Sequence, residues 1–406
     1  ADEPKGRMKL IKELYDALSL FKVSFPTPVM AGVRTKLKQF SSCVLIEVGD
    51  NLNSISAATD SVISYISRRA GIGINTGAIR ALGSPIRGGE AEHTGKIPFI
   101  KLLASAVKSC SQGGVRGGAA TLFYPFWHRE FEDLIVLKNN RGVEENRERR
   151  LDYSVQLNRL AYTRFLADED LSFFCPNDTP GLLDAFYADQ DEFERLYKKY
   201  EADETIKRKT LPAKEAFSRI IQERASTGRI YIQHIDHSNT HSAFNPEVAP
   251  VRQSNLCLEI TLPTEPVLKD GSGEIALCTL AAFNLGEINY NTELERLAYL
   301  LVKSLDNLLT MQDYPLEQAE RSVKKYRPLG IGVINYANML ANHKMKYSDG
   351  SANNLTHAVF EKIQYWLLKA SNKLAQELYP CEGFANTTYT QGLLPIDTYK
   401  KDIKSC

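Results

Sequence analysis

The chain has 406 residues and a mass of 45.5 kDa, a length that allows two or three domains or one large barrel. Hydrophobic residues make up 43%, enough for a large packed core, and no apolar run of about 18 residues predicts a transmembrane helix. Lys+Arg 50 against Asp+Glu 49 gives a net charge of +1, and neither end is strongly basic. We therefore expect no nucleic acid and no membrane among the partners.

The chain begins Ala-Asp-Glu-Pro-Lys-Gly-Arg, without an apolar signal-peptide core and without an initiator Met. This start indicates a chain that is processed or cut from something longer. The seven cysteines are dispersed and form no CxxC pair. That pattern is typical neither of a secreted disulfide framework nor of a zinc ribbon, so we predict a cytoplasmic protein without a metal site.

Helix-like and strand-like segments alternate along the chain. In the first part of the chain we predict a helix over 9–21, a strand over 40–48, and helices over 54–69 and 98–110. In the middle part we predict strands over 153–157 and 171–174, helices over 182–199 and 213–226, and strands over 229–233, 255–262 and 275–283. In the last part we predict a helix over 293–309, a strand over 330–335 and a helix over 353–377. Gly-rich stretches lie at 71–95 and 111–118. Repeated alternation of strand and helix favours a mainly parallel α/β architecture.

Three motifs resemble ligand-binding signatures without completing them. GGEAEHTGK, ending at Lys96, has its upstream glycine one position too early for a phosphate loop, and Ile97 replaces the Ser or Thr that would hold magnesium. The histidines in the string HIDHSNTH follow a strand and enter a polar loop, which favours hydrogen-bonded surface side chains over a metal site. GIGIN and LGIGVIN contain GxG, and neither completes GxGxxG.

The segment SNLCLEI has the residue types of a reactive site. Asn255, Cys257 and Glu259 are spaced at i, i+2 and i+4, so an extended backbone would direct all three side chains to one face. An amide, a thiol and a carboxylate together would supply a reactive sulfur, a general base and a group that orients substrate. An ordinary strand with one buried cysteine and two polar neighbours has the same composition, and the residues alone leave both interpretations open.

Two further cysteines lie on apolar strand-like runs, Cys43 in FSSCVLIEV and Cys278 in EIALCTLAAF. They could be inert core residues, or they could line one cavity and form a transient disulfide as a two-electron donor. Their spacing does not decide, because contact between residues so distant in sequence depends on the fold.

Nine motifs in order give a resemblance to a known family. They are KVSFPTPVMAGVRT, QFSSCVLIEVGD, RAGIGINTGAIRALGSPIRGGE, KSCSQGGVRGGAATLFYPFWH, LKNNRG, ERASTGRIYIQ, PVRQSNLCLEI, GEIALCTLAAFNLG and LGIGVIN. Together they resemble the large, catalytic chain of class I ribonucleotide reductase, most closely the aerobic class Ia chain of gamma-proteobacteria and their tailed phages. The resemblance extends from about Leu10 to Lys401.

The resemblance implies a fold and a domain arrangement. The family fold is a ten-stranded α/β barrel of two parallel five-stranded halves with a finger loop through its centre. We expect residues 1–39 to form a helical lead-in with a substrate-side loop, 40–401 an incomplete catalytic barrel and 402–406 a tail.

The resemblance also implies roles for the sulfur-containing segments. Cys257 would become the thiyl radical that abstracts the 3′ hydrogen of a ribonucleoside diphosphate, with Glu259 as base at the 3′ hydroxyl and Asn255 holding the sugar hydroxyls. Cys43 and Cys278 match the redox pair that delivers electrons and ends as a disulfide. Two more residues match family positions near the substrate phosphate and ribose, namely Thr27 and Ser42.

The Gly-rich stretches match the family's allosteric elements. Asp50 corresponds to the residue that holds the deoxyribose of an effector nucleotide, Leu52 lies beside it, and Arg80 and Arg87 match its phosphate binders. The stretch at 111–118 matches the loop between effector and substrate base. Its base-reading side chains would be Gln112 and Arg116, and its glycines would let it change conformation.

Cofactor and partners follow from the same resemblance. We expect no directly bound cofactor, a radical supplied by a small subunit with a dinuclear metal centre, and dNTP and ATP as effectors. The expected partners are ribonucleoside diphosphates, that small subunit, thioredoxin or glutaredoxin, and a second copy of the large chain. The products would serve DNA replication, in the cytoplasm of a bacterium or of a phage host.

The two ends depart from the family pattern. The helical nucleotide-binding cone that precedes the barrel in the family has no counterpart, and after GLLPIDTYKKDI the chain ends at Cys406. The last barrel strands, the paired tyrosines that relay the radical and the shuttle dithiol have no match. We expect a fragment or one half of a split chain, completed by a second polypeptide. Two alternatives are an inactive nucleotide-binding remnant and a glycyl-radical or cobalamin-dependent relative.

Overall fold

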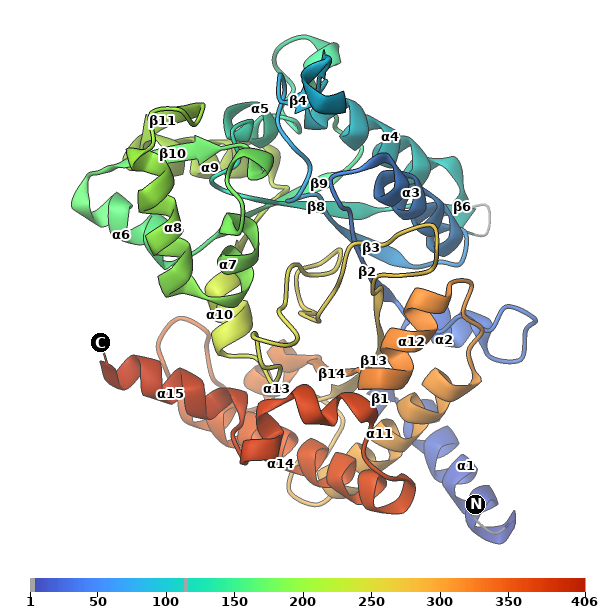
Figure 1. Ribbon diagram of the computed structural model, residues 1–406. Helices are drawn as coiled ribbons and strands as arrows, with labels where there is room; N and C mark the ends of the chain where they lie inside the picture. The colour runs from blue at the N-terminus through green and yellow to red at the C-terminus, as the bar shows by residue number, and fades with distance from the viewer. Residues whose placement is uncertain (1–3, 113–115, 406) are drawn as a thin grey trace. The chain divides into compact units, whose positions relative to one another are not determined.

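A computed structural model describes residues 4–112 and 116–405 (Figure 1). It divides into two compact units. The larger unit comprises Cys43–Leu277, Pro315–Ser322 and Gly383–Cys406, and the smaller comprises Ala1–Ser42, Cys278–Tyr314 and Val323–Glu382. In the described part of the chain, no helix is both long enough and apolar enough to cross a membrane.

The larger unit is built on a parallel sheet of five strands. In spatial order, which is also chain order, they are β2 (Cys43–Glu47), β3 (Gly71–Asn75), β8 (Ala120–Pro125), β9 (Asp152–Leu157) and β12 (Ile230–His234). Nearly every residue of the first four strands is buried, as expected for parallel strands covered on both faces. The predicted parallel α/β architecture is confirmed for this unit.

Helices connect these strands and surround them. They are α3 (Leu52–Ile66), α4 (Lys96–Ser109), α5 (Phe131–Ile135), α6 (Arg159–Ala167), α7 (Leu182–Ala188), α8 (Gln190–Ala202), α9 (Ala213–Thr227), α10 (Ile235–Thr240) and α15 (Pro395–Ser405). The Asn51 side chain caps α3 by accepting from Ser54 N at 2.8 Å, and Asn158 caps α6 in the same way. These caps fix where the chain turns from a strand end into a helix.

The single helix predicted over 182–199 is wrong. The structure has two helices there, α7 and α8, separated by Asp189 in an extended conformation. The Asp189 carboxylate accepts from the backbone N–H of Asp191 and of Glu192, both at 3.0 Å. An N-cap of this kind begins a new helix, so the apolar periodicity continues across the break while the backbone does not.

Three short antiparallel pairs lie outside the main sheet. The predicted strand at 171–174 is confirmed as β10 (Asp170–Phe174), and it pairs with β11 (Arg208–Pro212) rather than joining the parallel strands. The other two pairs are β4 (Pro85–Ile86) with β5 (Ala91–Glu92), and β6 (Ser111–Gln112) with β7 (Arg116–Gly117). Each Gly-rich stretch therefore contains one antiparallel pair of short strands.

The smaller unit has three strands and four longer helices. The strands are β1 (Val23–Ser24), β13 (Ala276–Asn284) and β14 (Leu329–Ile334); β13 pairs antiparallel with β1 and parallel with β14. The helices are α1 (Pro4–Ser19), α11 (Leu294–Met311), α13 (Tyr336–Asn342) and α14 (Asn353–Leu378), beside the one-turn α2 (Thr27–Gly32). The helices α11 and α14 pack together, and their apolar side chains belong with Phe283 of β13 to the buried cluster that forms the core of the unit. A further helix, α12 (Glu317–Tyr326), begins in the larger unit and ends in the smaller.

Candidate functional site

The strand predicted over 255–262 is wrong, and the structure has a turn at Leu256–Leu258 instead. Leu258 has a φ of 69°, which a strand does not allow. The Asn255 carboxamide oxygen accepts from the backbone N–H of Glu259 and of Ile260, both at 3.1 Å. These amides bond to a side chain instead of a neighbouring strand, so the segment folds back on itself. We call residues 250–264 the finger segment.

The turn brings the Asn255 amide and the Glu259 carboxylate close to the Cys43 thiol. The extended backbone predicted from the sequence did not include this contact with Cys43. Asn255 Nδ2 lies 3.0 Å from Cys43 Sγ, and the Cys43 thiol lies 3.7 Å from Glu259 Oε1. Cys43 and Asn255 are buried, whereas Cys257 and Glu259 are exposed on the turn. A buried sulfur and an exposed sulfur therefore belong to one local group that also holds a carboxylate.

Sequence reasoning missed a buried ion pair behind this group. Glu47, at the end of β2, is fully buried, and its carboxylate accepts from Arg252 Nη1 at 3.5 Å and from the Thr264 hydroxyl at 2.9 Å. Burial raises the pKa of the Glu47 carboxyl from its ordinary 4.5 to about 7, while Arg252 and Thr264 oppose that rise. Arg252 also bonds to Asp184 at 2.9 Å. The pair links β2 to both ends of the finger segment.

Tyr231 on β12 is a second residue that the sequence did not single out. Its pKa is raised, chiefly by burial, and the neighbouring Cys257 and Glu259 contribute to the same shift. A tyrosine beside an exposed thiol adds a phenol to the group. An apolar run such as RIYIQ does not distinguish such a tyrosine from an ordinary strand residue.

Two of the four predicted effector residues, Asp50 and Arg80, contact each other. Asp50 follows β2, and its carboxylate accepts from Arg80 Nε at 2.7 Å and from Arg80 N at 2.9 Å. Leu52 is exposed at the first position of α3. Arg87 is exposed between β4 and β5, and Arg80 Nη1 bonds to the Pro85 carbonyl at 2.8 Å, which ties Arg80 to the start of that hairpin.

Beneath this region lies the lysine of GGEAEHTGK. Lys96 is the first residue of α4 and is fully buried, and no group in the described residues bonds to its Nζ. Burial lowers the pKa of Lys96 and raises that of Glu130, whose carboxylate accepts from Lys96 N at 3.0 Å. A lysine enclosed in this way cannot reach a phosphate in solvent, consistent with the absence of a complete phosphate-loop motif.

Other predicted residues belong to the smaller unit or lie outside what the structure describes. Thr27 is exposed at the start of α2 in the smaller unit. In the same unit, Ser42 Oγ is buried and has no hydrogen-bond partner among the described residues. Cys278 lies on β13 of the smaller unit and Cys43 on β2 of the larger, so their pairing stays a prediction.

Two predicted residues belong to the second Gly-rich stretch. The backbones of Gln112 and Arg116 pair with each other, while their side chains and residues 113–115 lie outside the described part. The roles predicted for these two side chains therefore stay predictions.

The three histidines follow one another along α10 and its flanks. His234 Nε2 bonds to the Tyr162 hydroxyl at 2.7 Å, and the rings of His237 and His241 lie 4.9 Å apart. Among the residues that the structure describes, no group of three or more His, Cys, Asp or Glu side chains could hold a metal ion.

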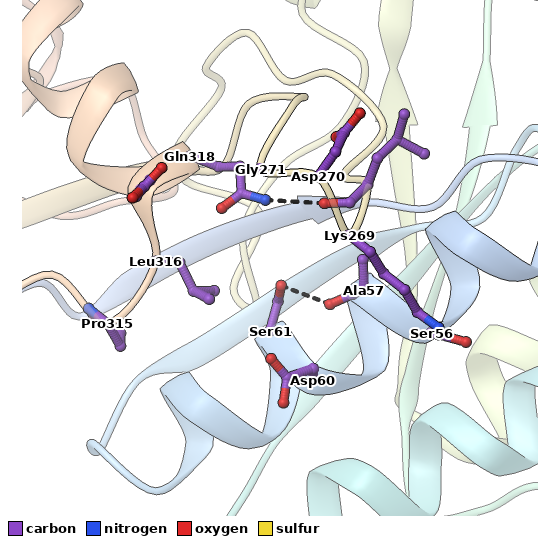
Figure 2. Close-up of a pocket in the computed structure, with 12 residues that line it drawn as sticks. Ser56, Ala57, Asp60, Ser61, Lys269, Asp270, Gly271, Pro315, Leu316 and Gln318 are labelled. Carbon is purple, nitrogen blue, oxygen red and sulfur yellow. Dashed lines mark hydrogen bonds between the residues drawn. The ribbon is translucent and has the colours of Figure 1, made fainter.

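A pocket of about 550 Å³ lies in the larger unit between α3, the loop at 268–271 and the segment that leads into α12 (Figure 2). The two hydrogen bonds drawn there join Ser61 to the Ala57 carbonyl and Gly271 to the Leu268 carbonyl. None of the predicted site residues lines this pocket. We therefore assign the candidate site to the finger segment and not to the pocket.

Comparison with known proteins supports a family assignment that agrees with this geometry. Residues 41–405 match the family described as "Ribonucleotide reductase, barrel domain". The chain belongs to the ribonucleotide reductase family. Its relatives include the ribonucleoside-diphosphate reductase subunit alpha of Haemophilus influenzae, 64% identical over 401 residues, which are 98% of this chain and 53% of that protein.

Two further relatives define the type of reductase. The chain is 65% identical over 399 residues to ribonucleoside-diphosphate reductase 1 subunit alpha of Escherichia coli, covering 98% of this chain and 52% of that protein. It is 51% identical over 405 residues to the subunit alpha of Enterobacteria phage T4, covering 99% of this chain and 53% of that protein. The resemblance to a class I alpha subunit of bacterial and phage type is thereby confirmed. The chain spans about half the length of these ribonucleotide reductase relatives.

Proposed function

We propose that the chain carries the sulfur chemistry of a ribonucleoside-diphosphate reductase, which reduces ribonucleoside diphosphates to 2′-deoxyribonucleoside diphosphates for DNA synthesis. One observation carries the proposal. Asn255, Glu259 and Cys43 form one hydrogen-bonded group, and that group adjoins the exposed Cys257. Membership of the ribonucleotide reductase family supports it.

In this proposal Cys257 acts as a thiyl radical that abstracts the 3′ hydrogen of the ribose. Glu259, exposed beside it, takes the proton of the 3′ hydroxyl. The resulting radical makes loss of the 2′ hydroxyl as water feasible. Asn255 holds the sugar hydroxyls, and its own contacts with Glu259 N and Ile260 N keep its side chain in place.

The two electrons come from Cys43 and Cys278. Their two S–H bonds supply two protons and two electrons, the 2′ hydroxyl leaves as water, and the sulfurs end as a disulfide. The 3′ hydrogen returns from Cys257, so its thiyl radical is regenerated. The disulfide is then reduced by thioredoxin or glutaredoxin.

Thr27 and Ser42 would contact the substrate phosphate and ribose. The buried Ser42 hydroxyl, which bonds to no described group, supports a role in ligand binding because such groups normally have a partner. Asp50, Leu52, Arg80 and Arg87 would hold a dNTP or ATP effector where two copies of the chain meet. Gln112 and Arg116 would relay the identity of that effector to the substrate base.

The whole enzyme needs more than this chain. The radical comes from a small subunit with a dinuclear metal centre. We further propose that a second polypeptide, or a continuation of this one, adds the strands that complete a ten-stranded barrel. The five parallel strands of the larger unit support this proposal, since they correspond to one half of such a barrel.

Replacement of Cys257 by Ser tests the proposal in the complete assembly. An alcohol O–H bond is too strong for the hydrogen-atom step, while the side-chain volume barely changes. We expect no detectable dCDP formation and unchanged dTTP affinity, both measured on one preparation. Cys110→Ala is the matched control, because Cys110 lies outside the group, and it should retain activity. Normal turnover by the Ser variant would exclude Cys257 from this role.

A further inference from the structure

The GIGIN motif that forms β3 does not complete a dinucleotide-binding signature, and the structure gives it another use. Residues 71, 73 and 75 alternate along the strand, so they share one face of the sheet. The finger segment runs antiparallel across this face. Gly71 lies against Leu256, Gly73 against Ser254, and Asn75 against Arg252.

Gly73 is needed for the close approach of the finger backbone, and Gly71 leaves room for the Leu256 side chain. A Cβ atom on Gly73 would lie 2.0 Å from the Ser254 carbonyl oxygen and 2.9 Å from the Asn255 Cα. A Cβ atom on Gly71 would lie 2.7 Å from Leu256 Cδ2. Neither glycine has a positive φ, so backbone freedom does not explain them. Gly73 lets a second backbone lie directly on the strand, and Gly71 accommodates a side chain of that second segment.

Side chains from three adjacent strands then hold the finger segment at two carbonyl groups. The Arg252 carbonyl accepts from Asn75 Nδ2 on β3 at 3.1 Å and from Gln156 Nε2 on β9 at 2.8 Å. The Leu256 carbonyl accepts from the Thr121 hydroxyl on β8 at 2.7 Å. Thr121 is fully buried and pairs with Gly73 across the sheet. The two anchored carbonyls, of Arg252 and Leu256, precede and follow Asn255 in the chain.

We propose that this face of β3 and Thr121, together called the seat, fix the register of the finger segment on the sheet and thereby position Cys257 for hydrogen abstraction. This inference rests on the proposed function. Cys257 is the residue directly after the carbonyl that Thr121 holds. Its turn is closed from the other side by Ser254 Oγ, which donates to the Ile260 carbonyl at 2.6 Å. The Thr121 hydroxyl and the two glycines are positioning residues, because they act on Cys257 only through the finger backbone.

Thr121→Val tests the seat, since it removes the hydroxyl and keeps the shape of the side chain. Thr121→Ser should restore the bond to the Leu256 carbonyl. Thr163→Val is the matched control, because the Thr163 hydroxyl also donates to a backbone carbonyl, that of Arg159 at 3.0 Å on α6. The first readout is the rate at which iodoacetamide alkylates Cys257 in the 406-residue chain, measured by peptide mass spectrometry relative to Cys110.

We expect Thr121→Val to alkylate at Cys257 about three- to tenfold faster than the parent chain, because the turn samples more open positions when one anchor is lost. Thr121→Ser and Thr163→Val should behave as the parent. In the complete assembly, Thr121→Val should lower kcat about tenfold or more, leave KM for CDP within about twofold, and recover with Ser. A merely structural defect would lower the folded fraction without this division between kcat and KM.

The outcomes separate the seat from the proposed reaction. Equal alkylation rates for Thr121→Val and parent, or an equal increase in Thr163→Val, would overturn the seat. Faster alkylation of Cys257 in Thr121→Val, together with dCDP formation by the separate Cys257→Ser variant, would leave the seat intact and refute the function. Gly73→Ala should be more severe than Thr121→Val, and the threonine pair keeps the test decisive if the alanine variant fails to fold.

Discussion

At the residue scale, the Asn255 side chain connects the finger turn to the sheet. Its carboxamide oxygen accepts two backbone amides while its Nδ2 lies against the Cys43 sulfur. A single side chain thus closes the turn that carries Cys257 and connects that turn to a second thiol. An aspartate could accept the same two amides, but it has no donor for the sulfur.

Glu47 is the residue whose protonation should be visible in the stability of the chain. Burial favours its neutral form, so the folded state holds a proton that the unfolded state releases above its ordinary pKa of 4.5. The free energy of unfolding should therefore fall as pH rises from about 4.5 to about 7 and level off above the folded-state pKa. At about 1.4 kcal/mol per pH unit, the loss is roughly 3 kcal/mol.

Glu47→Gln should remove this dependence, since the amide retains a partner for Thr264 and does not titrate. We expect the fall in unfolding free energy between pH 5 and pH 8, measured by urea denaturation, to shrink by up to about 3 kcal/mol. Glu361→Gln, an exposed carboxylate on α14, is the control and should leave the slope unchanged. Parallel pH curves for Glu47→Gln and parent would show that Glu47 does not hold a proton at neutral pH.

At the scale of elements, the adjacency of two parallel strands explains why two predicted effector residues, Asp50 and Arg80, meet although they come from different segments. β2 and β3 pair with Glu47 opposite Asn75, so both carboxyl ends reach the same edge. Asp50 follows the first strand and Arg80 the second, and their side chains pair there. Ligand sites in parallel α/β sheets commonly form at such ends. The β4–β5 hairpin, which carries the exposed Arg87, is linked to Arg80 through the Pro85 carbonyl.

Asp50→Ala should weaken effector binding. Loss of a hydrogen bond to a charged group costs about 1.5–3 kcal/mol, which corresponds to roughly ten- to hundredfold in the Kd for dTTP. Binding is measured by calorimetry on the 406-residue chain. Asp60→Ala, an exposed aspartate on α3, is the matched control and should bind as the parent. If Asp50→Ala bound dTTP as tightly as the control, the effector would have to bind elsewhere.

At the scale of the whole molecule, the chain holds a five-stranded parallel sheet in its larger unit and three further strands in its smaller one. Among the described residues, β14 pairs only with β13, which leaves its other edge open. Open edges of this kind readily pair with another strand. Together with coverage of about half of each relative, this edge supports a larger catalytic assembly.

The 406-residue chain alone should therefore form no dCDP, even with the small subunit, thioredoxin and CDP. Adding a polypeptide that supplies the part found only in the longer relatives should restore turnover, because it completes the barrel and the radical route. The same complement with the Cys257→Ser chain provides the background rate. Turnover by the isolated chain above that background would contradict the proposed need for a complement.

Much of the larger unit could be predicted from residues close in sequence. Three of the five parallel strands, β2, β9 and β12, were predicted at least approximately, and the order of motifs identified the family. No strand was predicted at β3, which lies in a Gly-rich stretch, or at β8, which lies in the motif KSCSQGGVRGGAATLFYPFWH. Burial on both faces of a parallel strand leaves a continuous apolar run, which is a local signal. The helix break at Asp189 was missed because an aspartate inside a polar helix and one at its N-cap look alike without the backbone.

What the sequence by itself determined was the family and the residue types available in SNLCLEI, namely an amide at Asn255, a thiol at Cys257 and a carboxylate at Glu259. Tertiary structure alone decided how they meet. Asn255 reaches Cys43 across 212 residues of chain, and Thr121 holds a carbonyl 135 residues away. Periodicity in sequence reports only which face of an element is buried, whereas such contacts depend on how distant elements pack. For that reason GIGIN, an incomplete nucleotide motif by its spacing, proved to be the strand on which the finger segment lies.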